Sequence, residues 1–122
     1  MQDCPAIRVM MMPRDTNAHG TIFGGVLLSY IDQAGAIAAR KESTHKFVTV
    51  AMDSVVFKQP VYVGDVLKLC TKITNRGRTS MTVSVDVIAE RFDDPSNEVQ
   101  VTAAELTYVS VDDNGRPTPW NP

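Results

Sequence analysis

Residues 17–40, NAHGTIFGGVLLSYIDQAGAIAAR, decide the fold of this chain. From residue 26 to residue 39 the segment is apolar or small apart from a few polar positions, and a run of this length favours a buried helix over a strand. Asp32 therefore falls in the middle of the core helix. A carboxylate there loses hydration, so Asp32 is either satisfied by a neighbouring group or poised for chemistry.

Helical spacing divides this segment into two faces. Positions three or four residues apart gather small side chains around Asp32 on one face, which leaves room for a ligand chain or another backbone. The larger side chains are expected around the rest of the cylinder, where they can fill a core. The small face comprises Gly25, Ser29, Asp32, Ala36 and Ala39, and the larger residues are Leu27, Leu28, Ile31 and Ile37.

Two glycines, Gly24 and Gly25, stand where this helix is expected to begin. Their missing side chains expose the free amide hydrogens of the first turn. The helix dipole and several unpaired N–H groups converge there, so the amides of Gly24, Gly25 and Val26 are candidate donors to an oxyanion. A glycine pair that serves only close packing is the alternative.

Length and composition predict one globular domain over residues 1–122, with an irregular tail from about residue 114. A net charge of −2 argues against non-specific binding of nucleic acid. The two cysteines, Cys4 and Cys70, lack metal-ligand spacing, and we expect two free thiols in a reducing compartment. No run reaches the length of a membrane span, and the start lacks a secretory pattern, so we expect a cytoplasmic protein.

The rest of the chain is rich in short strand patterns separated by turns. A single long helix with several strands at short spacing indicates an α+β fold, a five-stranded antiparallel sheet wrapped around the helix. Such a sheet leaves exposed edges, so we expect self-association through strand pairing. The expected strands cover residues 7–12, 47–57, 66–74, 80–91 and 99–111.

Four segments together resemble a known family: DTNAHGTIFGGVLLSYIDQAGAIAA, VTVAMDSVVFKQPVYVGD, RGRTS and TYVSVDDNGRPTP. They resemble the acyl-CoA thioesterases of the hot-dog fold. The most similar branch is the bacterial short- to medium-chain acyl-CoA hydrolases, related to the cytosolic (brain) acyl-CoA hydrolase. The resemblance covers roughly residues 7–119.

The resemblance implies hydrolysis of the thioester of acyl-CoA, in fatty acid metabolism, at a site shared between two protomers. In the family the helix aspartate acts on or near the attacking water, and this residue corresponds to Asp32. A loop asparagine, which corresponds to Asn17, belongs to the neighbouring protomer's side of the site. The family usually assembles as a trimer of dimers, so the resemblance implies a homohexamer.

The residues themselves leave the chemical route open. The chain has no GxSxG elbow and no Cys–His nucleophile pattern, which argues against a serine or cysteine acyl-enzyme. Asp32 can act as general base for water or attack directly to give an anhydride. Asn17 can donate to the carbonyl or simply form a turn, and His19 can polarise the carbonyl or be structural.

The CoA end of the substrate requires positive charge for its phosphates. Basic residues at turns between strands can reach a ligand, together with backbone and hydroxyl donors, although arginine-rich turns are often merely solvated. Water attack on a thioester needs no metal or organic cofactor, so CoA enters only as part of substrate and product. The candidate CoA-binding residues are Lys58, Arg76, Gly77, Arg78, Thr79, Ser80 and Phe57, and Tyr108 is a further candidate for the acyl or pantetheine channel.

Two other functions stay open. A hydroxyacyl-thioester dehydratase or hydratase of the same fold pairs a histidine with a helix carboxylate, and His19 with Asp32 imitates that pair. A non-catalytic acyl-CoA-binding module would keep the fold with an inactive helix acid.

Overall fold

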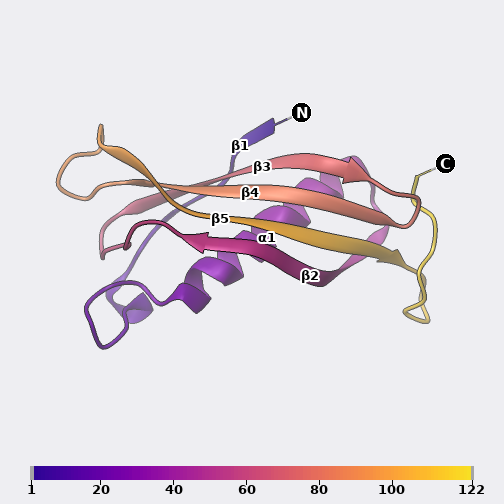
Figure 1. Ribbon diagram of the computed structural model, residues 1–122, viewed down its shortest axis with the longest axis horizontal. Helices are drawn as coiled ribbons and strands as arrows, with labels where there is room; N and C mark the ends of the chain where they lie inside the picture. The colour runs from indigo at the N-terminus through magenta and orange to yellow at the C-terminus, as the bar shows by residue number, and fades with distance from the viewer. Residues whose placement is uncertain (1, 122) are drawn as a thin grey trace.

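The computed structural model describes residues 2–121, and Figure 1 shows one helix lying against one sheet. A 3-10 turn, η1 (Pro13–Asp15), links the first strand to the loop before the helix. The long helix is α1 (Gly24–Glu42). The strands are β1 (Gln2–Met10), β2 (Lys46–Phe57), β3 (Val66–Arg76), β4 (Ser80–Glu90) and β5 (Glu98–Val111).

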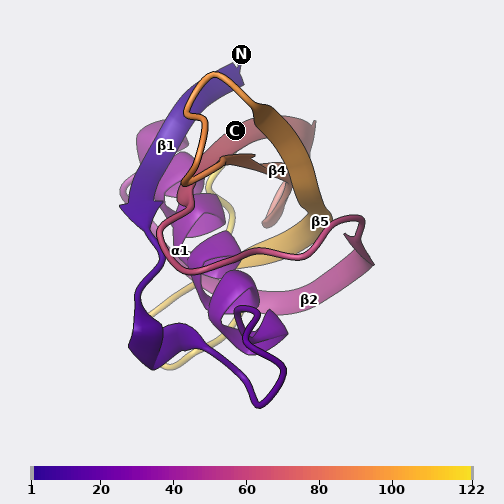
Figure 2. The same cartoon turned by 90° about the vertical axis from the view of Figure 1, so that its left-hand side faces the viewer.

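The five strands form one sheet in the order β1-β3-β4-β5-β2, and every neighbouring pair is antiparallel. Seen along the helix, the sheet curves around α1, with β1 on one side of the helix and β2 on the other (Figure 2). The predicted α+β architecture is therefore confirmed. Since β1 and β2 are the edges, each leaves one side without a strand partner among residues 2–121.

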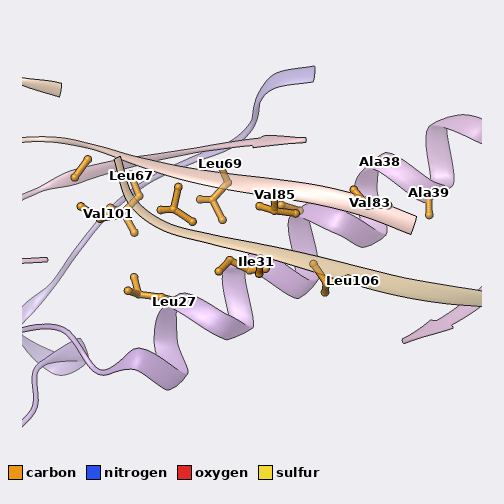
Figure 3. Close-up of a cluster of buried hydrophobic side chains, with 14 of the residues drawn as sticks. Leu27, Ile31, Ala38, Ala39, Leu67, Leu69, Val83, Val85, Val101 and Leu106 are labelled. Carbon is orange, nitrogen blue, oxygen red and sulfur yellow. The ribbon is translucent and has the colours of Figure 1, made fainter. Parts of the chain in front are cut away.

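The core lies between α1 and the concave face of the sheet (Figure 3). On β4 every second side chain is fully buried, as the strand's alternating sequence requires. The helix contributes a stripe of large and small residues that faces the same layer. Buried helix residues are Leu27, Ile31, Ala34, Gly35, Ala38 and Ala39, and those of β4 are Met81, Val83, Val85, Val87 and Ala89.

The predicted division of the helix faces is partly wrong. Ala39 lies in the core at 1% exposure, whereas Ile37 is 38% exposed. The reason is that the sheet approaches the helix closely and needs small side chains there. At Gly35, for example, an added Cβ would overlap the hydroxyl of Tyr108. Gly25, Ser29 and Ala36 do lie on the open face with Asp32.

The first strand begins earlier than predicted and ends at Met10, not at residue 12. Pro5 interrupts the pattern there, and proline is tolerated within a sheet mainly on an edge strand such as β1. The register between β1 and β3 shifts between Asp3 and Ile7. The regular alternation on which sequence analysis depends is therefore missing from this strand.

The prediction of two free thiols is wrong, because Cys4 and Cys70 form a disulfide. The two residues are 66 positions apart in sequence, and they meet because β1 pairs with β3. The bond fastens the edge strand to its neighbour. The two cysteines therefore do not indicate a reducing compartment.

Candidate active site

Asp32 is half-buried in the middle of α1, and two side chains hold one of its carboxylate oxygens. The hydroxyl of Thr49 donates to Oδ1 at 2.7 Å. The hydroxyl of Tyr108 donates to the Asp32 main-chain carbonyl at 2.8 Å and to Oδ1 at 3.1 Å. Within residues 2–121, Oδ2 has no hydrogen-bond partner. One oxygen is thus fixed and the other is available to a water molecule.

The register of the sheet brings these partners to Asp32. Thr49 of β2 lies directly opposite Tyr108 of β5. Further along β2, the ring of Phe57 covers the start of the helix, where a Cβ added at Gly24 would lie 3.3 Å from it. The edge strand β2 therefore runs beside α1, and the carboxylate lies next to an edge of the sheet that a second chain can extend.

Tyr108 is almost completely buried, and this burial, with the nearby Asp32 carboxylate, raises the pKa of its phenol well above the ordinary value. The phenol therefore stays protonated and donating at any physiological pH. The sequence marks Tyr108 only as a candidate for the acyl or pantetheine channel, and it does not single out Thr49. Neither position carries a sequence signal, because threonine and tyrosine are ordinary strand residues.

The raised pKa of Tyr108 predicts a pH dependence of stability. Because the pKa of the phenol is higher in the folded protein than its ordinary value of 10.0 in the unfolded chain, its contribution to stability is complete below about pH 10 and is lost as the pH rises further. We expect the free energy of unfolding to fall more steeply above pH 10 in the wild type than in Tyr108→Phe. Urea unfolding between pH 8 and pH 11 measures this, and parallel curves would contradict it.

The loop before the helix holds Asn17 by its own backbone. Asn17 Oδ1 accepts from the N–H groups of His19 at 2.8 Å and Thr21 at 3.2 Å, and its Nδ2 donates to the Thr21 hydroxyl at 2.8 Å. These contacts match the turn interpretation of Asn17. A second amide hydrogen on Nδ2 remains available for a ligand.

Asn17 and His19 do not meet Asp32 within one chain. Both precede Gly24, and the eight helical steps from Gly24 to Asp32 span about 12 Å. The His19 side chain is exposed and makes no hydrogen bond or ion pair among residues 2–121. A dehydratase-like pair of His19 and Asp32 is therefore absent from the described single chain.

The start of α1 offers free backbone donors. The N–H of Val26 bonds the Phe23 carbonyl at 3.1 Å, so this amide is already engaged. In the described chain, the amides of Gly24 and Gly25 have no such acceptor. An added Cβ at Gly25 would meet nothing within 4 Å, so packing does not require this glycine. Open space beside free N–H groups is what an oxyanion site needs.

The candidate CoA-binding residues fall into two groups at opposite ends of α1. Lys58 directly follows β2 near the helix start, and its Nζ donates to Gln100 at 3.1 Å. The turn between β3 and β4 (residues 76–80) lies near the helix end, because Arg76 pairs with Glu42 at 2.5 Å. The two groups therefore cannot contact one phosphate from the same chain.

The C-terminal segment braces the turn between β3 and β4. The N–H of Trp120 donates to the Arg78 carbonyl at 3.1 Å, and its indole N–H donates to the Ser80 carbonyl at 2.9 Å. An added Cβ at Gly77 would lie 2.4 Å from the Ser80 hydroxyl oxygen, so a larger residue there would displace that side chain. Thr79 contributes its backbone carbonyl, which accepts from the N–H of Ser110 at 2.8 Å. The turn is thus fixed on both sides.

A metal site and a membrane-spanning helix are two further features relevant to function. Among residues 2–121 no cluster of three or more histidine, cysteine or acidic side chains is arranged to hold a metal ion. No helix in the same range combines the length and apolarity that crossing a bilayer requires.

Comparison with known proteins gives a consistent family. Residues 19–92 match the family model described as the thioesterase superfamily. The chain is 38% identical over 115 residues to acyl-CoA thioester hydrolase YciA of Salmonella typhimurium. The alignment covers 93% of this chain and 86% of that protein.

Solved structures agree with the sequence comparison. A hexameric hot-dog fold thioesterase of Campylobacter jejuni superimposes with a TM-score of 0.89 at 47% identity, covering 96% of this chain and 90% of that one. An acyl-CoA hydrolase of Staphylococcus aureus, solved with butyryl-CoA, CoA and CoA disulfide, gives 0.85 at 33% identity, covering 97% and 70%. The hot-dog fold predicted from the resemblance is confirmed.

Proposed function

This chain belongs to the thioesterase superfamily, and we propose that it hydrolyses the thioester of acyl-CoA to free CoA and a carboxylic acid. The observation that carries the mechanism is the asymmetric environment of Asp32. Thr49 and Tyr108 hold Oδ1, while Oδ2 remains open to water. Such a carboxylate is oriented to accept a proton from one direction.

In the proposed reaction, Oδ2 of Asp32 takes a proton from water as the water oxygen attacks the thioester carbonyl. The negative charge that develops on the carbonyl oxygen is stabilised by free amides at a helix start, with Gly25 as the main donor. The tetrahedral intermediate then collapses, the carbon–sulfur bond breaks, and the CoA thiolate recovers the proton. Direct attack by Asp32 on the thioester carbonyl, which expels the CoA thiolate and gives an anhydride, is the second route. When water then attacks the Asp32 carbonyl of the anhydride, the bridging enzyme oxygen stays in the acid. A single turnover in ¹⁸O-labelled water that releases unlabelled acid and labels Asp32 would therefore identify this route.

We propose that the helix start comes from a partner protomer. Within one chain the free amides of Gly24 and Gly25 lie about 10–12 Å along the helix from Asp32, which is too far for one carbonyl carbon. The unpaired edge of β2 carries exposed apolar side chains, with Val50 at 54% and Val56 at 48% exposure. Antiparallel pairing of two such edges sets the middle of one helix beside the start of the other, with its Asn17 and His19.

Pairing of this kind also unites the two groups of candidate CoA-binding residues. Lys58 and Phe57 of one protomer approach the 76–80 turn of the other, so that both can contact one CoA molecule. Because the Campylobacter jejuni relative is a hexamer, we propose a homohexamer built from three such dimers. No cofactor is required for water attack on a thioester, and location in the cytoplasm stays a prediction.

The function is tested by incubating the purified protein with acyl-CoA substrates of increasing chain length and trapping the released thiol. We expect thiol release from at least one chain length. Parallel incubation with an enoyl-CoA, followed by loss of its absorbance, tests the dehydratase alternative. Absorbance loss without thiol release would contradict the proposal.

A further inference from the structure

A hollow of about 470 Å³ lies where α1 ends and β2 begins. Three of its lining side chains are basic, and the lining includes no carboxylate. A second hollow of about 360 Å³ adjoins it and shares Arg40 and Thr44. The first hollow is lined by Ala36, Arg40, Thr44, His45, Lys46 and Phe47.

The cations of this hollow lack partners within the described chain. Among residues 2–121, neither Arg40 nor Lys46 makes a side-chain hydrogen bond or an ion pair. By contrast, Lys58 is bonded to Gln100 and Arg76 is paired with Glu42. Arg78 and Lys72 likewise lack side-chain partners among residues 2–121, but they do not line this hollow. Arg40 and Lys46 therefore combine unused capacity with a shared space.

The helix dipole explains only part of this arrangement. Arg40 in the last turn of α1 complements the partial negative charge at the helix C-terminus. His45 and Lys46 lie beyond the helix and do not serve that purpose. Nδ1 of His45 is 2.7 Å from the Ser43 hydroxyl, which fixes the ring and leaves Nε2 unused. Cations from two elements thus converge on one space, which is the arrangement that phosphate groups require.

The hollow continues the open face of α1 that carries Asp32. Ala36, one turn beyond Asp32, already belongs to its lining. Arg40 follows after another turn, about 12 Å along the helix from Asp32. A CoA thioester has the same layout, because an extended pantetheine arm separates the reacting sulfur from the phosphates and the adenine.

We propose that this hollow binds the nucleotide half of CoA, with Arg40 and Lys46 contacting its phosphates. The half-buried ring of Phe47, which Trp120 contacts edge-on at 5.8 Å between ring centres, offers a surface against which adenine packs. This inference rests on the proposed acyl-CoA thioesterase function. It adds the end of α1 to the candidate CoA-binding residues of the 76–80 turn. The ion pair between Arg76 and Glu42 holds that turn at the same end of the helix.

Calorimetric titration with adenosine 3′,5′-diphosphate, the nucleotide half alone, tests the site without catalysis. We expect the wild type to bind this probe and the double variant Arg40→Gln, Lys46→Gln to bind at least about 10-fold more weakly, since hydrogen bonds between charged groups are strong. Lys72→Gln is the matched control, because it removes an exposed cation from β3. Equal affinity in wild type and double variant, or no binding to either, would overturn the inference.

Steady-state kinetics give an independent readout. In the double variant we expect the KM for acyl-CoA to rise about 10-fold at unchanged kcat. The KM for the matching acyl-pantetheine, which lacks the nucleotide, should stay at the wild-type value. An equal rise for both substrates would indicate a general structural defect and overturn the inference. Absence of acyl-CoA hydrolysis by the wild type would instead contradict the proposed function. The calorimetric titration would still test whether the hollow binds the nucleotide.

Discussion

Asp32→Asn is expected to lower kcat for acyl-CoA hydrolysis at least about 100-fold, the usual scale for loss of a general base. The asparagine Oδ1 can still accept hydrogen bonds from Thr49 and Tyr108, so the helix and its neighbours should keep their positions. What the variant loses is the oxygen that takes up a proton from water. Thiol release under saturating acyl-CoA measures the change.

The matched control is Asp113→Asn, which neutralises an exposed carboxylate in the turn after β5 and should leave kcat unchanged. Wild-type turnover in Asp32→Asn would exclude Asp32 as base or nucleophile. If neither the wild type nor the variant turns over acyl-CoA and both bind CoA equally, the chain is the non-catalytic binding module that its sequence also allows.

The second large effect concerns Asp65, whose side chain is almost fully buried at the turn before β3. It accepts hydrogen bonds from the N–H groups of Tyr62 and Phe92, both at 3.0 Å, and from Arg91 at 2.7 Å. Arg91 also donates to the Pro60 carbonyl at 2.9 Å and lies over the Tyr62 ring. One carboxylate thus fastens two turns that are distant in sequence.

Asp65→Ala should lower the free energy of unfolding by about 3–5 kcal/mol, because it leaves a mostly buried guanidinium and two backbone N–H groups without their acceptor. Urea unfolding at fixed protein concentration measures the loss. Asp93→Ala, which removes an exposed carboxylate near the same turn, should change stability by less than about 0.5 kcal/mol. A similar loss in both variants would contradict the role given to Asp65.

The helix and most strands are predictable from sequence because their patterns are regular. On β4 the alternation of apolar and polar residues matches the alternation of burial along the whole strand. The division of the helix faces is harder to predict. Ala39 is buried and Ile37 is exposed because the sheet lies so close to the helix that only small side chains fit between them, and the sequence does not show where this happens. The disulfide between Cys4 and Cys70 forms because β1 pairs with β3, and the spacing of the two cysteines in the sequence does not predict that pairing.

The site shows the same limit. Asp32 could be found because a charge within an apolar helix is an evident anomaly. Thr49 and Tyr108 could not, because their contact with Asp32 follows from the pairing of β2 with β5. The hollow at the helix end was missed for another reason. A basic residue at a helix C-terminus is expected from the helix dipole alone, so Arg40 by itself does not indicate a binding site. Only the structure shows that Lys46 lines the same hollow.

Whether Asp32 of one protomer works with the Asn17 loop of its partner is tested most directly by co-expressing Asp32→Asn and Asn17→Ala chains. Each variant alone should be nearly inactive. Random pairing makes about half of the dimers mixed, and each mixed dimer has one intact site, so we predict roughly a quarter of wild-type activity. Activity no higher than the average of the two separate variants would contradict a site shared between protomers.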